Sequence, residues 1–123
     1  MLLHEHSFTS KSDSEMVIPL YKRYGVDFQS RLRDEFAVYV YDSRLKRLAI
    51  ARDRLGIKPL FWTRLGGQIF IASEMKAFLE LGWRPNWDVR SIRSEAWLYD
   101  DRTIFQGVKT ILPGRYAIVE SDA

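Results

Sequence analysis

Residues 36–51 read FAVYVYDSRLKRLAIA, two apolar runs separated by a short charged stretch. The first run, 36–41, is apolar or aromatic at every position, which is typical of a strand buried on both faces. The charged stretch predicts a turn, and residues 48–51 predict the returning strand. A second pair of strands is expected at 60–63 and 68–72, because the Gly-Gly dipeptide between them favours a hairpin turn.

A helical pattern precedes these strands. Ser12 and Glu15 have the S-x-x-E spacing of a capping box, and the apolar residues that follow recur at helical spacing. A helix is therefore predicted from Ser12 to a stop at Gly25. Pro19 lies inside it and should kink it, because proline lacks the N–H that would bond to Glu15. A short second helix is expected at about 27–32.

Two helical segments and a strand are expected after the hairpin. Ser73 is predicted to cap a helix that ends at Gly82 and turns three apolar side chains inward: Met75, Phe78 and Leu79. Another helix is predicted at 88–98 and a last strand at 115–120. This order predicts an α+β fold with a mainly antiparallel sheet that needs cover on both faces. Because one early helix precedes the strands, the chain is expected to lack part of one layer.

Composition narrows the possible functions. The 123 residues are 46% hydrophobic, enough for one compact domain or most of one, and they include no cysteine. Disulfides, thiolate metal sites and a cysteine nucleophile are therefore excluded within this chain. The net charge is +3, but the basic residues are scattered among acids, so no nucleic-acid partner is predicted. No apolar run is long enough for a membrane span, and no secretory signal is present, so a cytoplasmic protein without a membrane partner is expected.

Asp13 is the candidate ligand-binding residue. If Ser12 caps the helix, Asp13 occupies the first helical position, where free backbone N–H groups keep its carboxylate ionised. A fixed anion there can hold a ligand ammonium group, or it can simply favour the helix start. No cofactor is predicted. No metal site is predicted either, because the pair His4 and His6 has no third ligand nearby in the sequence.

The segment ARDRLGIKPL (51–60) predicts a stiff corner between two strands, because a charged turn there contains glycine and proline. Within it, Arg52, Asp53 and Arg54 can pair with one another or with a neighbouring domain, and the pattern leaves these alternatives open.

Three segments taken together carry a family resemblance: SDSE (12–15), ARDRLGIKPL (51–60) and ASEMKAF (72–78). They resemble the glutaminase domain of glutamine-hydrolysing asparagine synthetases, which are class II glutamine amidotransferases, and the ending FQGVKTILPG (105–114) favours this branch. The resemblance implies that residues 1–123 are the later part of such a domain, an incomplete α-β-β-α sandwich of the N-terminal-nucleophile hydrolase type. It also implies that the ligand is glutamine and that Asp13 binds its α-amino group.

The chain also departs from the family pattern. The family nucleophile is an N-terminal cysteine whose own α-amino group serves as base, whereas this chain begins Met1-Leu2. The family's carboxylate-binding arginine and its Asn-Gly-Glu oxyanion element would lie upstream of Met1, and the ATP-dependent synthetase domain is absent from the 123 residues. The family usually has glycine where Asp34 stands, and Asp would tolerate a positive φ there at some cost.

The resemblance therefore implies a chain that is inactive alone, although its family carries out glutamine hydrolysis. Whether the chain is an enzyme is left open. The alternative is a non-catalytic binding or regulatory module that complements an N-terminal fragment or docks on an asparagine-synthetase-type synthetase domain through 51–60. Family knowledge assigns no catalytic role to five residues of the matching segments, which are expected to be architectural or domain-facing: Arg52, Asp53, Lys58, Ser73 and Glu74.

Overall fold

The computed structural model describes Thr9 and residues 12–120, except for the side chain of Asp13. Its strands form two three-stranded sheets with antiparallel pairing throughout, ordered β1-β2-β6 (sheet A) and β4-β3-β5 (sheet B). The strands are β1 Ala37–Asp42, β2 Arg47–Arg52, β3 Phe61–Leu65, β4 Gln68–Ala72, β5 Val108–Thr110 and β6 Tyr116–Glu120. The helices, with η for 3-10 helix, are η1 Asp13–Met16, α1 Val17–Tyr24, η2 Gly25–Arg31, η3 Met75–Leu81, α2 Val89–Arg93 and η4 Ala96–Leu98. The predicted α+β class is confirmed.

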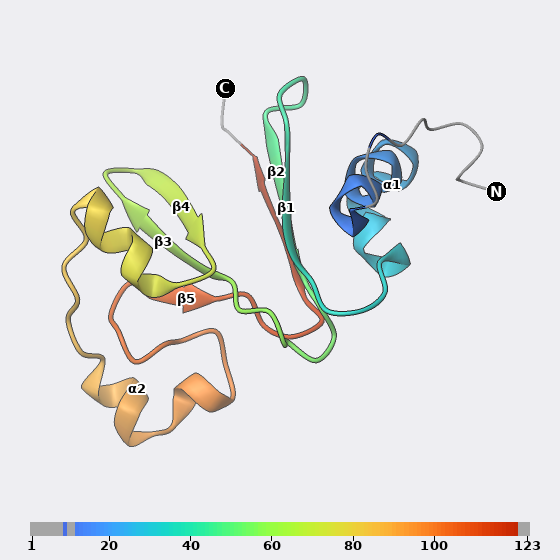
Figure 1. Ribbon diagram of the computed structural model, residues 1–123. Coiled ribbons are helices and arrows are strands. Elements are labelled where there is room, and N and C mark those ends of the chain that lie inside the picture. The colour runs from blue at the N-terminus through green and yellow to red at the C-terminus, as the bar shows by residue number, and fades with distance from the viewer. Residues whose placement is uncertain (1–8, 10–11, 121–123) are drawn as a thin grey trace.

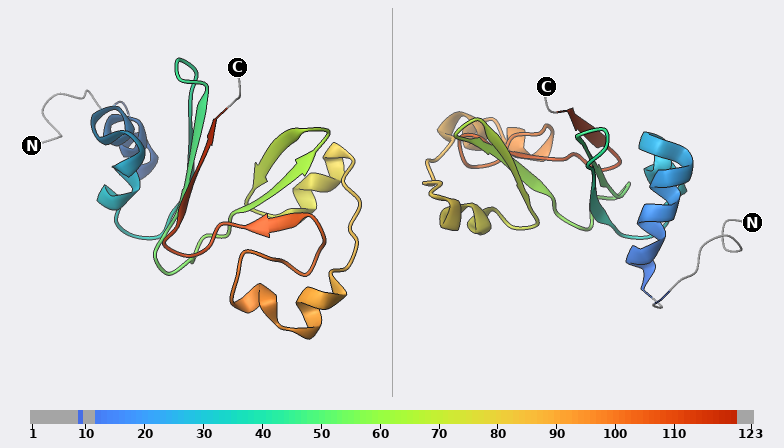
Figure 2. Two further views of the ribbon diagram at one scale, coloured as in Figure 1. Left: turned by 180° about the vertical axis from the view of Figure 1, so that it is seen from behind. Right: turned by 90° about the horizontal axis from the view of Figure 1, so that it is seen from above.

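The elements stack in four layers (Figures 1 and 2). The segment from η1 to η2 covers the outer face of sheet A, sheet B faces the inner side of sheet A, and η3 packs on the outer face of sheet B. The two sheets come together at the segments that link β2 to β3 and β5 to β6, and they diverge away from these links (Figure 1). The 51–60 corner thus lies where the two sheets meet.

The core of sheet A forms because successive side chains of β1 and β2 point to opposite faces of the sheet. Val40 of β1 and Ala49 of β2 are directly paired and buried against α1 and η2, where Phe28 is 1% exposed. On the opposite face, Ile50 packs with Leu60 and Ile111 between the two sheets. The predicted strands at 36–41 and 48–51 are therefore confirmed, and each of their ends differs by one residue from that of β1 or β2.

The inner face of β1 differs from the expectation of full burial. Tyr39 and Tyr41 point to the side of sheet B but are 65% and 63% exposed, because the sheets have diverged at this height (Figure 1). Within the described residues, a helical segment lies on the outer face of each sheet. The expectation that part of a layer lies outside these 123 residues stays a prediction.

The helical segment on the outer face of sheet B differs from its prediction in two respects. Phe78 is 1% exposed and packs edge-to-face on Trp83. As predicted, the segment ends at Gly82, which has φ 86°. However, the segment is a 3-10 helix whose N-cap is Glu74, one residue after the expected cap Ser73. Leu79 was expected inside and is 41% exposed, because a 3-10 helix turns every three residues and changes which side chains share a face.

The first helix is also built differently from its prediction. Ser12 occupies the N-cap of η1, but its side chain makes no capping hydrogen bond, and the carboxylate of Glu15 accepts instead from the backbone N–H (2.7 Å) and hydroxyl (3.0 Å) of Thr9. The α-helix begins only at Val17, so Pro19 lies within its first turn. There its missing N–H is tolerated, because the first four N–H groups of a helix have no intrahelical partner.

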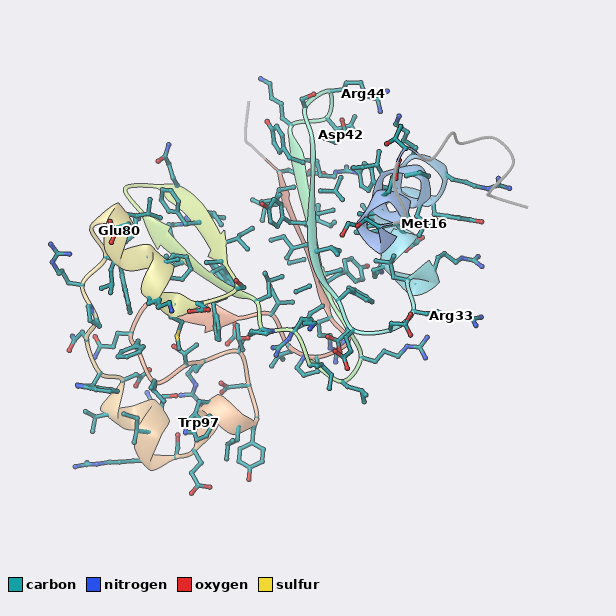
Figure 3. All side chains as sticks on the ribbon, viewed as in Figure 1. Met16, Arg33, Asp42, Arg44, Glu80 and Trp97 are labelled. Carbon is teal, nitrogen blue, oxygen red and sulfur yellow. The ribbon has the colours of Figure 1, made fainter. Side chains whose placement is uncertain are left out.

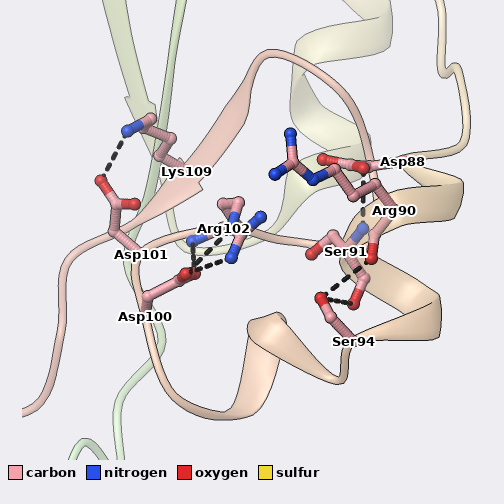
Figure 4. A network of polar contacts seen from close by, with 8 residues as sticks. All are labelled: Asp88, Arg90, Ser91, Ser94, Asp100, Asp101, Arg102 and Lys109. Carbon is pink, nitrogen blue, oxygen red and sulfur yellow. Dashed lines mark hydrogen bonds and ion pairs between the residues drawn. The ribbon is translucent and has the colours of Figure 1, made fainter.

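The predicted helix at 88–98 is interrupted. Asp88 caps α2 by accepting from the N–H of Ser91 (2.9 Å), but Glu95 takes a left-handed φ of 53° and separates α2 from η4. Polar contacts around this turn, including the ion pair between Asp100 and Arg102 (2.7 Å), hold the segment together (Figure 4). Trp97, labelled in Figure 3, lies on η4 and is 46% exposed.

Candidate functional site

A cleft of about 410 Å³ opens beside the start of the first helix. Ser14 and Val17 line one wall, the connection 32–38 lines another, and residues 58–59 and Ser73 complete it. Its apolar residues come from α1, from β1, from the connection before β1 and from Pro59. Its charged lining residues are of both signs and are listed here: Arg33, Asp34, Glu35 and Lys58. The cleft therefore offers an apolar surface together with cationic and anionic groups.

Asp13 lies next to this cleft in the chain. It is the first residue of η1 and directly precedes Ser14, which lines the cleft, while its side chain lies outside what the structure describes. The turn is held in place by the N–H of Glu15, which donates to the carbonyl of Ser12 (3.1 Å). The backbone of the predicted ligand-binding residue thus lies one position before a residue that lines the cleft.

The connection from η2 to β1 forms the wall shared by this cleft and a neighbouring one of about 420 Å³, which reaches to Asp53 and Leu55. Within the connection, Asp34 has φ 73°, so the position where the family usually has glycine takes a conformation that favours glycine. The carbonyl of Phe36 accepts from the N–H of Asp53 (2.8 Å), which ties the connection to the 51–60 corner.

Asp53 organises the corner. Its side chain is buried, and its carboxylate accepts from the N–H groups of Leu55 (3.0 Å), Ile57 (3.1 Å) and Lys58 (3.1 Å). Burial alone would raise the pKa of Asp53, but these backbone hydrogen bonds, with one from Gly56, lower that pKa below its ordinary value. Asp53 therefore remains ionised as a structural group that closes the loop 53–58.

Arg52 joins the two sheets at the same corner. Its guanidinium donates to the carbonyls of Lys58 (2.8 Å), Gly56 (2.7 Å) and Ile111 (2.8 Å), and to the hydroxyl of Thr110 (3.1 Å). Burial lowers the pKa of Arg52, which the nearby charge of Asp53 opposes. Because Arg52 belongs to β2 and Thr110 to β5, this side chain bonds sheet A to sheet B. The alternative of side-chain pairing between Arg52 and Asp53 is not what the structure shows.

The other residues of uncertain role fall into two groups. Lys58 and Ser73 line the cleft, and the Lys58 ammonium lies 3.7 Å from the carboxylate of Glu35 across its rim. Glu74 pairs with Lys76 (2.7 Å) at the surface. The sequence did not predict that Ser14, Lys58 and Ser73 line one cleft, because no local pattern signals that three distant segments meet.

Among the residues that the structure describes, no three or more His, Cys, Asp or Glu side chains gather as a metal site, and His4 and His6 lie outside those residues. In the same part of the chain, no helix has the length and apolar character needed to cross a membrane.

Comparison with known proteins assigns the family. The glutamine amidotransferase domain family matches residues 1–123, so the chain belongs to this family. Over 117 residues it is 46% identical to the amidase chyE of Penicillium rubens and 45% identical to the amidase chry2 of Gibberella zeae, in each case covering 95% of this chain and 17% of the relative. It is 35% identical over 125 residues to the glutamine-hydrolyzing asparagine synthetase 3 of Bacillus subtilis, covering 95% of this chain and 20% of that protein.

These matches confirm the predicted resemblance to the glutaminase domain of asparagine synthetases. The chain spans only about a fifth or less of the length of these relatives.

Proposed function

We propose that this chain is the glutamine-recognition part of a class II amidotransferase domain, with Asp13 binding the α-ammonium group of glutamine. The observation that carries the proposal is the cleft beside Ser14, whose lining combines an apolar surface with charges of both signs. Glutamine is a zwitterion with an aliphatic side chain, so such a cleft suits it. The helix–sheet–sheet–helix layering supports an N-terminal-nucleophile hydrolase fold, of which residues 1–123 form a part.

We further propose that the chain does not hydrolyse glutamine by itself. The family reaction needs a cysteine thiolate to attack the side-chain amide, and these 123 residues contain no cysteine. Purified chain is expected to release no glutamate above a blank without protein. Glutamate release that disappears in Asp13→Ala would contradict this part of the proposal.

Glutamine binding by Asp13 can be tested separately from catalysis. Calorimetric titration with glutamine should show weak binding that falls about tenfold or more in Asp13→Asn, because a hydrogen bond to a charged group contributes roughly 1.5–3 kcal/mol. Asp27→Asn is a matched control, because Asp27 is an exposed carboxylate on η2. The analogue of glutamine without its α-amino group should bind the original chain and Asp13→Asn equally. Equal glutamine affinity in both proteins would refute the assignment.

A second candidate function is docking on a synthetase domain of the asparagine-synthetase type through the corner. Leu55 and Ile57 are 79% and 50% exposed at its outer surface, although Arg52 and Asp53 hold the backbone beneath them rigidly. A preorganised loop with exposed apolar side chains loses little entropy on binding.

The docking function can be tested with a purified synthetase domain from an asparagine synthetase. Leu55→Ser with Ile57→Ser should abolish its capture by the immobilised chain. The control is Leu45→Ser, which changes another exposed leucine (58%) in the turn between β1 and β2. Loss of capture in the control as well would show that the corner is not the docking surface.

A further inference from the structure

Two walls of the cleft of about 410 Å³ are attached to the corner by hydrogen bonds. One wall is the connection 32–38, and the other is formed by residues 58–59. Among the described residues that line this cleft, neither Arg52 nor Asp53 occurs. Both residues nevertheless bond to the backbone of the walls, so they can affect the cleft without lining it.

Asp53 holds both walls from behind. Its N–H donates to the carbonyl of Phe36 (2.8 Å), and Oδ2 of its carboxylate accepts from the N–H of Lys58 (3.1 Å). Phe36 belongs to the first wall and Lys58 to the second. Asp53 is 2% exposed, so water competes little for these hydrogen bonds. The two walls are therefore joined through one buried residue.

Arg52 fixes the second wall from its other side. Its Nε donates to the carbonyl of Lys58 (2.8 Å), whereas Asp53 accepts from the N–H of the same residue. Both backbone polar groups of Lys58 are thus bonded, which holds the peptide planes on either side of its Cα. The guanidinium is anchored in turn by the carbonyls of Gly56 (2.7 Å) and Ile111 (2.8 Å). A planar fork with several fixed acceptors has little freedom to shift.

We propose that Arg52 and Asp53 are positioning residues for glutamine binding, which hold the two walls of the cleft at the separation that glutamine requires. This inference rests on the proposed glutamine-binding function of the cleft. The two residues act through the backbone of Phe36 and Lys58, without contact to the ligand. A wall that is ordered before binding costs the complex less entropy than a wall that must be ordered by the ligand.

A role limited to joining the sheets predicts a different outcome. Variants would then lose stability, but the molecules that remain folded would bind glutamine as before. The corner offers a selective variant for this question. Asp53→Asn keeps Oδ1, which accepts from Leu55 and Ile57. Its amide group takes the place of Oδ2 and faces the N–H of Lys58, so it releases the cleft wall and keeps the rest of the loop.

The first test measures the glutamine dissociation constant by calorimetric titration, under conditions in which urea unfolding shows that each variant is folded. Asp53→Asn and Arg52→Gln should each raise this constant about tenfold, because each variant frees one backbone group of Lys58. A constant that is unchanged in both variants would overturn this inference alone. If the original chain does not bind glutamine, the proposed function fails, and this inference fails with it.

Two control variants lie away from the cleft. Gly67→Ala strains the turn between β3 and β4 at φ 80°, so it should lower the urea midpoint without changing the glutamine dissociation constant. Arg47→Gln removes an arginine from the other end of β2, where it pairs with Glu120 of β6, and should also leave this constant unchanged. Losses of affinity as large in these controls would indicate a general effect of stability and refute positioning.

The second test needs no ligand, so its outcome does not depend on the proposed function. Amide hydrogen exchange, measured by NMR, reports on the N–H of Asp53, which joins the two walls. Arg52→Gln should accelerate exchange at Asp53 and Lys58 about tenfold, because loss of the guanidinium loosens the loop locally. The N–H of Asp88, which donates to the carbonyl of Ile104 (2.9 Å), is the control amide. Equal acceleration there, or none at Asp53 and Lys58, would overturn the inference.

Discussion

Removal of the Asp53 carboxylate should unfold the corner on which both sheets depend. Asp53→Ala removes a buried carboxylate that accepts from three backbone N–H groups, those of Leu55, Ile57 and Lys58. Each orphaned donor costs about 1 kcal/mol at the low end of the usual range, so the free energy of unfolding should fall by about 3 kcal/mol. Asp53→Asn retains one oxygen and should lose about 1–2 kcal/mol, because its amide group faces the N–H of Lys58.

Urea unfolding followed by tryptophan fluorescence measures these differences, since the chain has four tryptophans. Asp27→Ala, at an exposed carboxylate, should shift the midpoint little. The order of stability should be Asp27→Ala, then Asp53→Asn, then Asp53→Ala. If Asp53→Ala unfolds at the same urea concentration as the Asp27 control, the carboxylate does not hold the corner and the reasoning is wrong.

The stabilities of the original chain and of Asp53→Asn can also be compared as a function of pH. The pKa of Asp53 is lower in the folded chain than its ordinary value of 3.8, because hydrogen bonds to the ionised form outweigh burial. The ionised group therefore stabilises the fold above pH 3.8, and this contribution is lost as pH falls through the lower folded pKa. The stability difference between the original chain and Asp53→Asn should shrink in that acidic range. A difference that is constant with pH would contradict this account.

Two backbone predictions follow from positive φ angles. Asp34→Gly should raise the free energy of unfolding by about 1 kcal/mol, because φ 73° strains an L-residue with a Cβ. The midpoint of urea unfolding measures this gain, and an unchanged midpoint would mean that Asp34 is not strained. Gly56→Ala should destabilise by about 2 kcal/mol or more, since its Cβ would lie 2.6 Å from Cγ of Pro113 at φ 66°. Gly67→Ala, at φ 80° with no neighbour within 4 Å, isolates the conformational part, so equal losses in both variants would disprove the clash.

Local patterns in the sequence were sufficient for the family and for five of the six strands in the described residues, whereas β5 was not predicted. The apolar run at 36–41 and its return at 48–51 became β1 and β2, and Gly66-Gly67 marked the turn between β3 and β4. These predictions succeeded because strand alternation and turn chemistry depend on residues that are neighbours in the chain.

Helix type and capping depended on tertiary contacts. The Glu15 carboxylate accepts from Thr9, and the side chain of Ser12 makes no capping hydrogen bond. Likewise, η3 is a 3-10 helix that exposes Leu79. Propensity is a weak determinant in short helices, so packing against the sheets decided their geometry.

The roles of Arg52 and Asp53 were decided only by the tertiary structure. Their motif indicated the family, but Arg52 donates to the hydroxyl of Thr110 and to the carbonyl of Ile111, which lies 59 residues away in the sequence. The cleft was also beyond the reach of sequence patterns, because Ser14, Lys58 and Ser73 meet there from three separate segments. Residue identity and spacing thus determined the family and most of the strands. The closeness of distant segments, which no local spacing encodes, determined the corner and the cleft.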